Sequence, residues 1–178
     1  MPRITPLTTD HQSILECLAV LRLLVGRMET DDDVDPADVR TVMDFMRDIG
    51  CECLEHTEQL LLRPALSRAT QQELSRRLRT ALARHHTVRP LVDDATAVLT
   101  SRKRFVMHAH LLNKVVSDLI QDEDASLLED AAGVLNDPDG QRNVEIFVQR
   151  GREKRAIVTQ RGEALHRLEA KYAYPASS

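Results

Sequence analysis

Apolar residues recur every three or four positions along most of this chain, the spacing that gathers them on one face of an α-helix. The spacing predicts helices over about residues 8–28, 36–64, 71–100, 103–135 and 141–172. No useful stretch alternates between apolar and polar residues in steps of two, as a half-buried strand would. The pattern therefore predicts an all-α fold.

Breaks between these helices fall at residues that suit helix ends. Asp35 followed by Pro36 reads as an N-cap and a first-turn proline. Pro90 interrupts the third stretch and predicts a break or a kink there. The run NDPDG at 136–140 predicts a turn before the last helix.

Four long amphipathic helices joined by short loops predict an up-down-up-down four-helix bundle. The bundle would span about residues 8–136, within a single domain of residues 1–178. An additional C-terminal helix at about 141–172 would pack against the bundle or extend to a partner.

The composition fits this fold and excludes several classes of function. Of 178 residues, 42% are apolar, but the chain has only two Tyr, three Phe and no Trp, so the core must be mainly aliphatic. With six Gly and no Gly-rich loop, we expect no nucleotide-binding motif. No apolar run approaches the ~18 residues of a membrane span and no signal peptide is visible, so we expect no membrane association. Three Cys, an odd number, argue against a disulfide framework and for a reduced, cytoplasmic protein.

The net charge of −4 is unevenly distributed. The stretch 29–58 is acidic, whereas 63–104 and 142–171 are basic. Basic residues are not interleaved with aromatic ones and no recognition motif appears, so we expect no nucleic-acid binding. Solvated helix faces of opposite sign that attract one another explain the pattern.

The stretch CECLEHTEQLLLRPAL, residues 51–66, combines residue types that bind metals with a leucine-rich helix face. At about 100° per residue, Glu58 lies on the apolar side with Leu54, whereas His56 and Arg63 lie on the polar side. We therefore interpret His56 as a solvated side chain. A buried Glu58 is costly unless it is neutralised, paired or bound to a cation.

Four segments, in this order along the chain, carry a resemblance to a known family. They are TTDHQSIL with His11, FMRDIGCECLEHTEQLLLRPAL with Glu58, ARHHTVRPLV with His85 and Arg89, and SDLIQDEDASLL with Glu123 and Asp124. Together they cover about residues 8–130 and resemble the hemerythrin-like (HHE cation-binding) proteins. The family's histidines on the second and fourth helices fall here on Leu54 and Leu119.

The resemblance implies a metal site inside the bundle. Its ligands, carried over residue by residue, are His11, Glu58, His85 and Asp124. Glu55 and Glu123 lie close to two of these positions and would supply carboxylates in place of the lost histidines. The implied metal is non-haem iron, mononuclear or di-iron, with Mn or Zn as alternatives, or no metal at all.

The implied function is the binding or sensing of O2, NO or peroxide, or a reaction with one of them, at a carboxylate-rich site. Whether the protein is an enzyme stays open. The alternative is a metal-free helical bundle that has lost the di-iron site and acts in interaction or regulation. Leu at both vacated histidine positions favours this alternative, in which the C-terminal helix contacts a protein partner or completes a homodimer.

The lengths of the helices predict where the four ligands meet. Counted from the loop that joins each helix pair, His11 and Glu58 reach similar depths, as do His85 and Asp124. We therefore expect all four at one end of the bundle. Residues 71–84 would then overshoot that end by roughly two turns, which predicts a break or bend before His85.

Overall fold

The computed structural model describes residues 5–173, except for the side chains of residues 5–10, 124 and 125. Every regular element in this range is helical, so the predicted all-α class is confirmed. None of the helices within residues 5–173 is long and apolar enough to cross a membrane.

Long helical rods follow one another along the chain. The first is α1 (Thr5–Glu29). The second runs through α2 (Pro36–Phe45), the π-helical turn η1 (Met46–Gly50), α3 (Cys51–Thr57), the π-helical turn η2 (Glu58–Leu62) and α4 (Arg63–Arg68). Next comes α5 (Gln72–Ala97), and then α6 (Arg102–Asp122), which continues through the π-helical turn η3 (Glu123–Leu127) into α7 (Leu128–Val134). The last is α8 (Pro138–Ala173).

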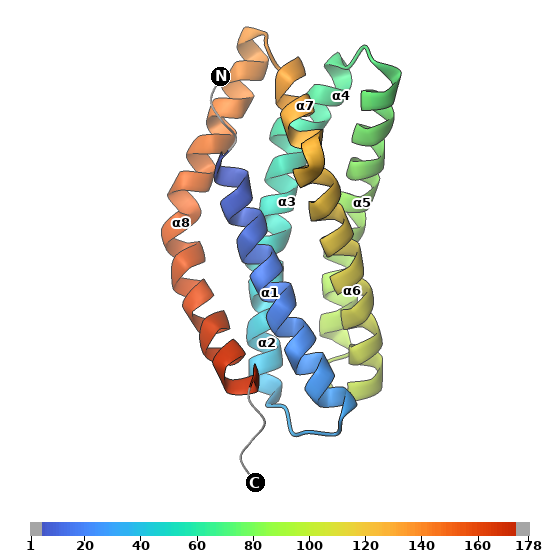
Figure 1. Ribbon diagram of the computed structural model, residues 1–178, viewed down its shortest axis with the longest axis vertical. Helices are drawn as coiled ribbons and strands as arrows, with labels where there is room; N and C mark the ends of the chain where they lie inside the picture. The colour runs from blue at the N-terminus through green and yellow to red at the C-terminus, as the bar shows by residue number, and fades with distance from the viewer. Residues whose placement is uncertain (1–4, 174–178) are drawn as a thin grey trace.

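The rods lie side by side along the long axis of the molecule (Figure 1). α1 packs against both α6 and α8, and α5 packs against α6. α8, drawn in orange to red, runs beside α1 and also contacts α2 and η2 (Figure 1). The apolar residues that α8 buries within its own chain include Val144, Phe147, Val158, Leu165 and Leu168.

Two helix starts agree with their sequence signals. The Asp35 side chain caps α2, because it accepts a hydrogen bond from the backbone N–H of Ala37 at 2.8 Å. Asp137, in the turn before α8, accepts a hydrogen bond from the backbone N–H of Gly140 at 2.5 Å. The predicted N-cap and the predicted turn are therefore both confirmed.

The course of α5 corrects the prediction of a break. The helix continues through Pro90 and is also continuous before His85. The turns before His85 do not project beyond the packed part of the molecule, since Leu74 and Leu78 are buried in a hydrophobic cluster of their own. The predicted break was wrong because α4, α7 and the start of α8 extend the molecule at this end (Figure 1).

The hydrophobic core is divided into two clusters. Four rods contribute to both: the second rod, α5, the rod of α6, η3 and α7, and α8, and in the first three of these a buried polar residue lies between the two clusters. In the second rod, Leu54 belongs to one cluster and Leu61 to the other. The same holds for Val88 and Leu82 in α5, and for Ile120 and Leu127 across α6 and η3. Between these pairs lie Glu58, His85 and Glu123, all of them buried. The boundary between the two apolar clusters is therefore polar.

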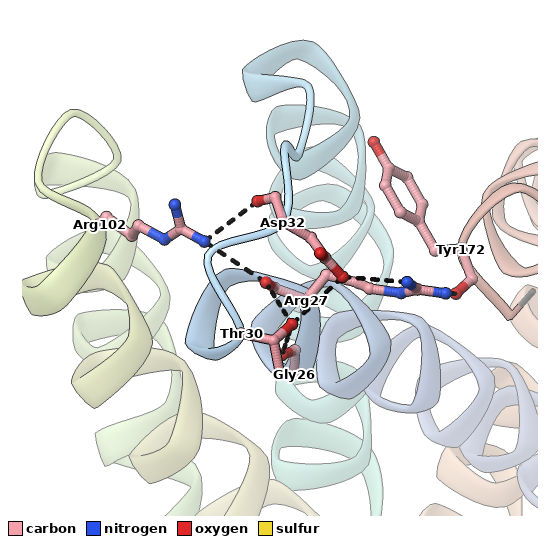
Figure 2. A network of polar contacts seen from close by, with 6 residues as sticks. All are labelled: Gly26, Arg27, Thr30, Asp32, Arg102 and Tyr172. Carbon is pink, nitrogen blue, oxygen red and sulfur yellow. Dashed lines mark hydrogen bonds and ion pairs between the residues drawn. The ribbon is translucent and has the colours of Figure 1, made fainter. Parts of the chain in front are cut away.

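The C-terminal end of α8 is fixed to α1 and α2, and Figure 2 shows this end of the molecule. Arg27 donates hydrogen bonds from Nε and Nη2 to the carbonyl oxygen of Tyr172, at 3.2 and 3.0 Å. The Tyr172 hydroxyl donates to Asp38 at 2.7 Å. Arg102, at the start of α6, donates to the carbonyl oxygen of Asp32 at 3.1 Å (Figure 2). These contacts hold α1, α2, α6 and α8 together where the hydrophobic core ends.

Candidate functional site: a buried histidine and carboxylate cluster

Three side chains from three helical rods meet at the boundary between the two apolar clusters. His11 comes from α1, His85 from α5 and Glu123 from the first position of η3, and we call them the inner cluster. Their exposed fractions are 1%, 6% and 1%. Glu123 Oε1 lies 2.6 Å from His85 Nε2, and Glu123 Oε2 lies 3.3 Å from His11 Nε2. The carboxylate therefore bridges the two imidazoles.

The hydrogen bonds of His85 require a cation in this cluster. His85 Nδ1 lies 3.0 Å from the carbonyl oxygen of Leu54, and because a carbonyl only accepts, Nδ1 must carry a hydrogen. Burial by itself raises the pKa of Glu123, but the close contacts with His11 and His85 outweigh it, and the pKa is lowered. With both ring nitrogens of His85 facing acceptor oxygens, a proton or another cation must lie between Nε2 and the carboxylate.

The second oxygen of Glu123 is available for a further interaction. Among the residues that the structure describes, Glu123 Oε2 accepts no well-formed hydrogen bond, although His11 Nε2 lies within ion-pair distance. A carboxylate oxygen buried in this way is unfavourable unless it has a partner. The inner cluster thus combines two imidazoles with a carboxylate that has spare capacity for a cation.

A π-helical turn accompanies the inward position of Glu123. The backbone N–H of Leu128 donates to the carbonyl of Glu123, five residues earlier. Such turns insert an extra residue into a helix and occur often at functional sites. The sequence signal for Glu123 is its position four residues after Leu119 and four before Leu127, both of them buried. Asp124 has a similar relation to Ile120 and Leu128, so the sequence pattern does not separate the two carboxylates.

Glu58 takes part in a different set of contacts. It is 8% exposed, and its Oε1 accepts a hydrogen bond from Arg63 Nε at 2.7 Å and lies 3.0 Å from His86 Nε2. Burial raises the pKa of Glu58, but the hydrogen bonds from Arg63 and His86 outweigh this and the pKa is lowered. Within the described part of the chain, no hydrogen bond or ion pair joins Glu58 to the inner cluster.

The remaining predicted ligands are not brought into the inner cluster by any described contact. Glu55 is on the exposed side of α3, where it accepts a hydrogen bond from Arg89 at 2.6 Å. The side chain of Asp124 lies outside the described residues. The structure thus brings together His11 and His85 of the predicted set, and it joins them through Glu123.

The two leucines that the resemblance places at the family's histidine positions are core residues. Leu54 is 2% exposed and Leu119 is 0% exposed, and both belong to the apolar cluster that also contains Val88 and Ile120. Their side chains bring apolar atoms where imidazoles would supply nitrogen ligands. Within the described residues, no group of three or more His, Cys, Asp or Glu side chains has an arrangement that could hold a metal ion.

His56 does not lie in open solvent as its sequence position suggested. α8 covers this side of α3, and His56 is half-buried, with Nδ1 3.4 Å from Lys154 Nζ. Burial, followed by the nearby charges of Lys154 and Arg150, lowers the pKa of His56. The predicted solvated side chain is therefore partly covered, because the interpretation left the last helix out of this face.

The thiols are an unsuitable source of reactivity. Cys17, Cys51 and Cys53 are buried, and no disulfide bond joins any of them. Burial raises the pKa of Cys51 to about 11 and also raises the pKa of Cys17. Because the thiolate is the reactive form, these two cysteines are chemically inert side chains of the core.

The chain matches no protein-family model, and neither a curated protein nor a solved structure matches it significantly. The resemblance to the hemerythrin-like proteins therefore stays a prediction.

Proposed function

We propose that the inner cluster binds a divalent metal ion, preferably non-haem iron, in an up-down-up-down bundle of the hemerythrin-like kind. The proposed ligands are His11, His85 and Glu123. Glu58 and Glu55 are outside this set because each is already paired with an arginine. The observation that carries the proposal is that both ring nitrogens of His85 face acceptor oxygens, so that a cation is needed beside Nε2.

The contacts of His85 resemble those that orient metal-binding histidines in general. Such a histidine usually donates its other ring N–H to a carbonyl or a carboxylate, which fixes the ring and directs the second nitrogen to the metal. The carbonyl of Leu54 has this role for His85. In the metal-free protein, a proton takes the place beside Nε2, and a metal ion would displace it.

The donor set also suits particular metals. Two imidazoles and one carboxylate are the ligands of many non-haem iron(II) sites, and Zn and Mn accept the same donors. The spare capacity of Glu123 Oε2 supports the fit, since this buried oxygen accepts no well-formed hydrogen bond within the described residues. The separation of the donor atoms limits this fit. Within the described residues, no group of three or more His, Cys, Asp or Glu side chains is already arranged to hold an ion.

The chain's own residues would define the chemistry of such a site. When bound, the metal supplies a position at which O2, NO or peroxide can bind. Glu123 would neutralise part of the positive charge of the metal ion, and His11 and His85 would bind the ion inside the apolar core. Leu54 and Leu119 exclude water and supply no donor atoms, so a site with fewer nitrogen ligands than the family's own is expected.

Metal content after loading tests the proposal. Untagged protein is stripped with EDTA, loaded anaerobically with Fe(II), desalted and measured by mass spectrometry of the metal. We expect stoichiometric iron in the wild type and none in His85→Ala or Glu123→Gln, each checked for helicity by circular dichroism. His110→Ala is the matched control, since His110 also contacts a carboxylate, Glu29 at 2.8 Å, but on the surface. Trace iron in the wild type, or equal iron in all variants, would contradict the proposal.

A metal-free bundle acting in interaction or regulation is the second candidate. It is favoured by the buried leucines at positions 54 and 119 and by the neutralisation of Glu58 by Arg63. In this case the inner cluster holds a proton and stabilises the fold only. The same experiment separates the candidates, because a metal-free bundle takes up no iron although His85→Ala still lowers its stability.

A further inference from the structure

A pocket lies on the outer side of α3, where α8 passes over it, and we call it the outer pocket. Its volume is about 270 Å³, just below the roughly 300–1,000 Å³ typical of small-molecule sites. Phe147 and Val158 form buried parts of its wall, and Ile157, also in the wall, is 54% exposed. An apolar group in the pocket would cover Ile157 together with these two buried side chains and so remove apolar surface from water. The pocket therefore suits a small molecule with an apolar part.

The charges around the outer pocket do not cancel. The cations Arg150, Lys154 and Arg161 face two carboxylates, Asp48 and Glu52. Lys154 forms an ion pair with Glu52, and Arg161 donates a hydrogen bond to Asp48 at 2.6 Å. Among the residues that the structure describes, Arg150 has no hydrogen-bond or ion-pair partner. One positive charge is therefore left for a ligand.

His56 adds a neutral hydrogen-bond donor to the same wall. The ammonium of Lys154 lies 3.4 Å from His56 Nδ1, and because an ammonium only donates, Nδ1 acts as the acceptor. In the neutral ring the hydrogen is then on Nε2. Since burial and the charges of Lys154 and Arg150 lower the pKa of His56, the ring adds a donor without adding a charge.

We propose that the outer pocket binds a small organic monoanion, namely a carboxylate with an apolar tail. Arg150 pairs with the carboxylate, since guanidinium groups bind carboxylates through strong charge-assisted hydrogen bonds. The tail lies against Phe147, Val158 and Ile157. A single unpaired cation favours a monoanion over a phosphate dianion, and the apolar wall favours a fatty or aromatic acid over an inorganic ion. This proposal does not depend on a metal in the inner cluster.

Titration calorimetry with three probes separates the contribution of the ligand's charge to the binding affinity from that of its apolar tail. Octanoate has both, octanamide has the tail without the charge, and acetate has the charge without the tail. The variant Arg150→Ala is compared with Arg152→Ala, which removes an exposed arginine of α8 that is not part of the pocket wall. All solutions contain EDTA, so that no metal ion contributes.

We expect the wild type to bind octanoate about tenfold or more tightly than octanamide or acetate, the effect of a hydrogen bond to a charged group. Arg150→Ala should lose about the same factor for octanoate and none for octanamide. Arg152→Ala should bind as the wild type does. The proposal is overturned if octanoate does not bind, if octanamide binds equally well, or if both arginine variants lose affinity equally.

Discussion

The two sides of α3 face two polar regions, one buried in the core and one open to solvent. On the inner side, the Leu54 carbonyl orients His85 within a cluster whose three members are at most 6% exposed. On the outer side, His56 lines a pocket that solvent reaches and where Arg150 has no described partner. Burial explains the difference, because an uncompensated charge is costly in the core and inexpensive at the surface. The contacts of His85 call for a proton or a metal ion beside its Nε2, whereas the proposed ligand of the outer pocket would exchange with solvent.

Removing the inner carboxylate should have the largest effect on stability. Glu123→Ala leaves two buried imidazoles without their bridging charge, and we expect it to lower the free energy of unfolding by about 3–5 kcal/mol. Urea denaturation followed by circular dichroism measures the change. Glu55→Ala is the control on the exposed side of α3, where loss of the pair with Arg89 should cost at most about 1 kcal/mol. Equal losses in both variants would remove the distinction between the two sides.

Introducing an imidazole at position 54 should sharpen the contrast. Leu54→His buries a polar ring in an apolar cluster of the core and should cost about 2–4 kcal/mol without metal. Zn2+ should recover part of this loss if the new ring joins His11, His85 and Glu123 as a ligand. Thermal unfolding in EDTA and in Zn2+ measures both effects. Leu112→His, at a fully buried position three turns before η3, is the control. It should lose a similar amount of stability, and Zn2+ should not recover any of this loss.

Acid should weaken the contact that fixes α8. Burial raises the pKa of Asp38, but the hydrogen bonds from Lys171 and Tyr172 outweigh it and lower the pKa overall. A carboxyl with a lowered folded-state pKa stabilises the fold above its unfolded pKa, and this contribution disappears as the pH falls through the folded value. Asp38→Asn should therefore cost about 1 kcal/mol near neutral pH and nothing in strong acid. Urea midpoints measured across the acid range check this, and a cost that does not change with pH would contradict it.

The smallest effect on stability is expected in the outer pocket. Arg150→Ala removes a charge that has no described partner, so the free energy of unfolding should change by no more than about 0.5 kcal/mol. Urea denaturation with and without octanoate measures it, and the ligand should stabilise the wild type more than the variant, which binds it about tenfold less tightly. A large loss of stability without ligand would show that Arg150 has a structural role.

Local sequence patterns predicted the helical elements well. The apolar spacing indicated an all-α chain, and the cap at Asp35 and the turn near Asp137 followed from the preferences of short polar side chains. The sequence also predicted that His11 and His85 belong to one site, and both contact Glu123. These features depend on residues within one or two turns, or on the order of helices along the chain.

Features that depend on π-helical turns and on the last helix were not predictable. In η2, the backbone N–H of Arg63 bonds to the carbonyl of Glu58, five residues earlier, and the two side chains pair. A regular α-helix would place them about 140° apart, which is why Arg63 was assigned to the opposite side. The outer pocket was missed because the sequence does not show that α8 covers His56.

The protonation of His85 tests the central claim most directly. Two-dimensional NMR that correlates the ring nitrogens with the ring hydrogens reports which nitrogen carries a proton. In metal-free protein near neutral pH, both nitrogens should behave as protonated, with the proton beside Nε2 shared with Glu123. After addition of Zn2+, Nε2 should lose its proton while Nδ1 keeps the hydrogen that it donates to Leu54. An unprotonated Nε2 in the metal-free protein, unchanged by Zn2+, would contradict the claim that this cluster requires a cation.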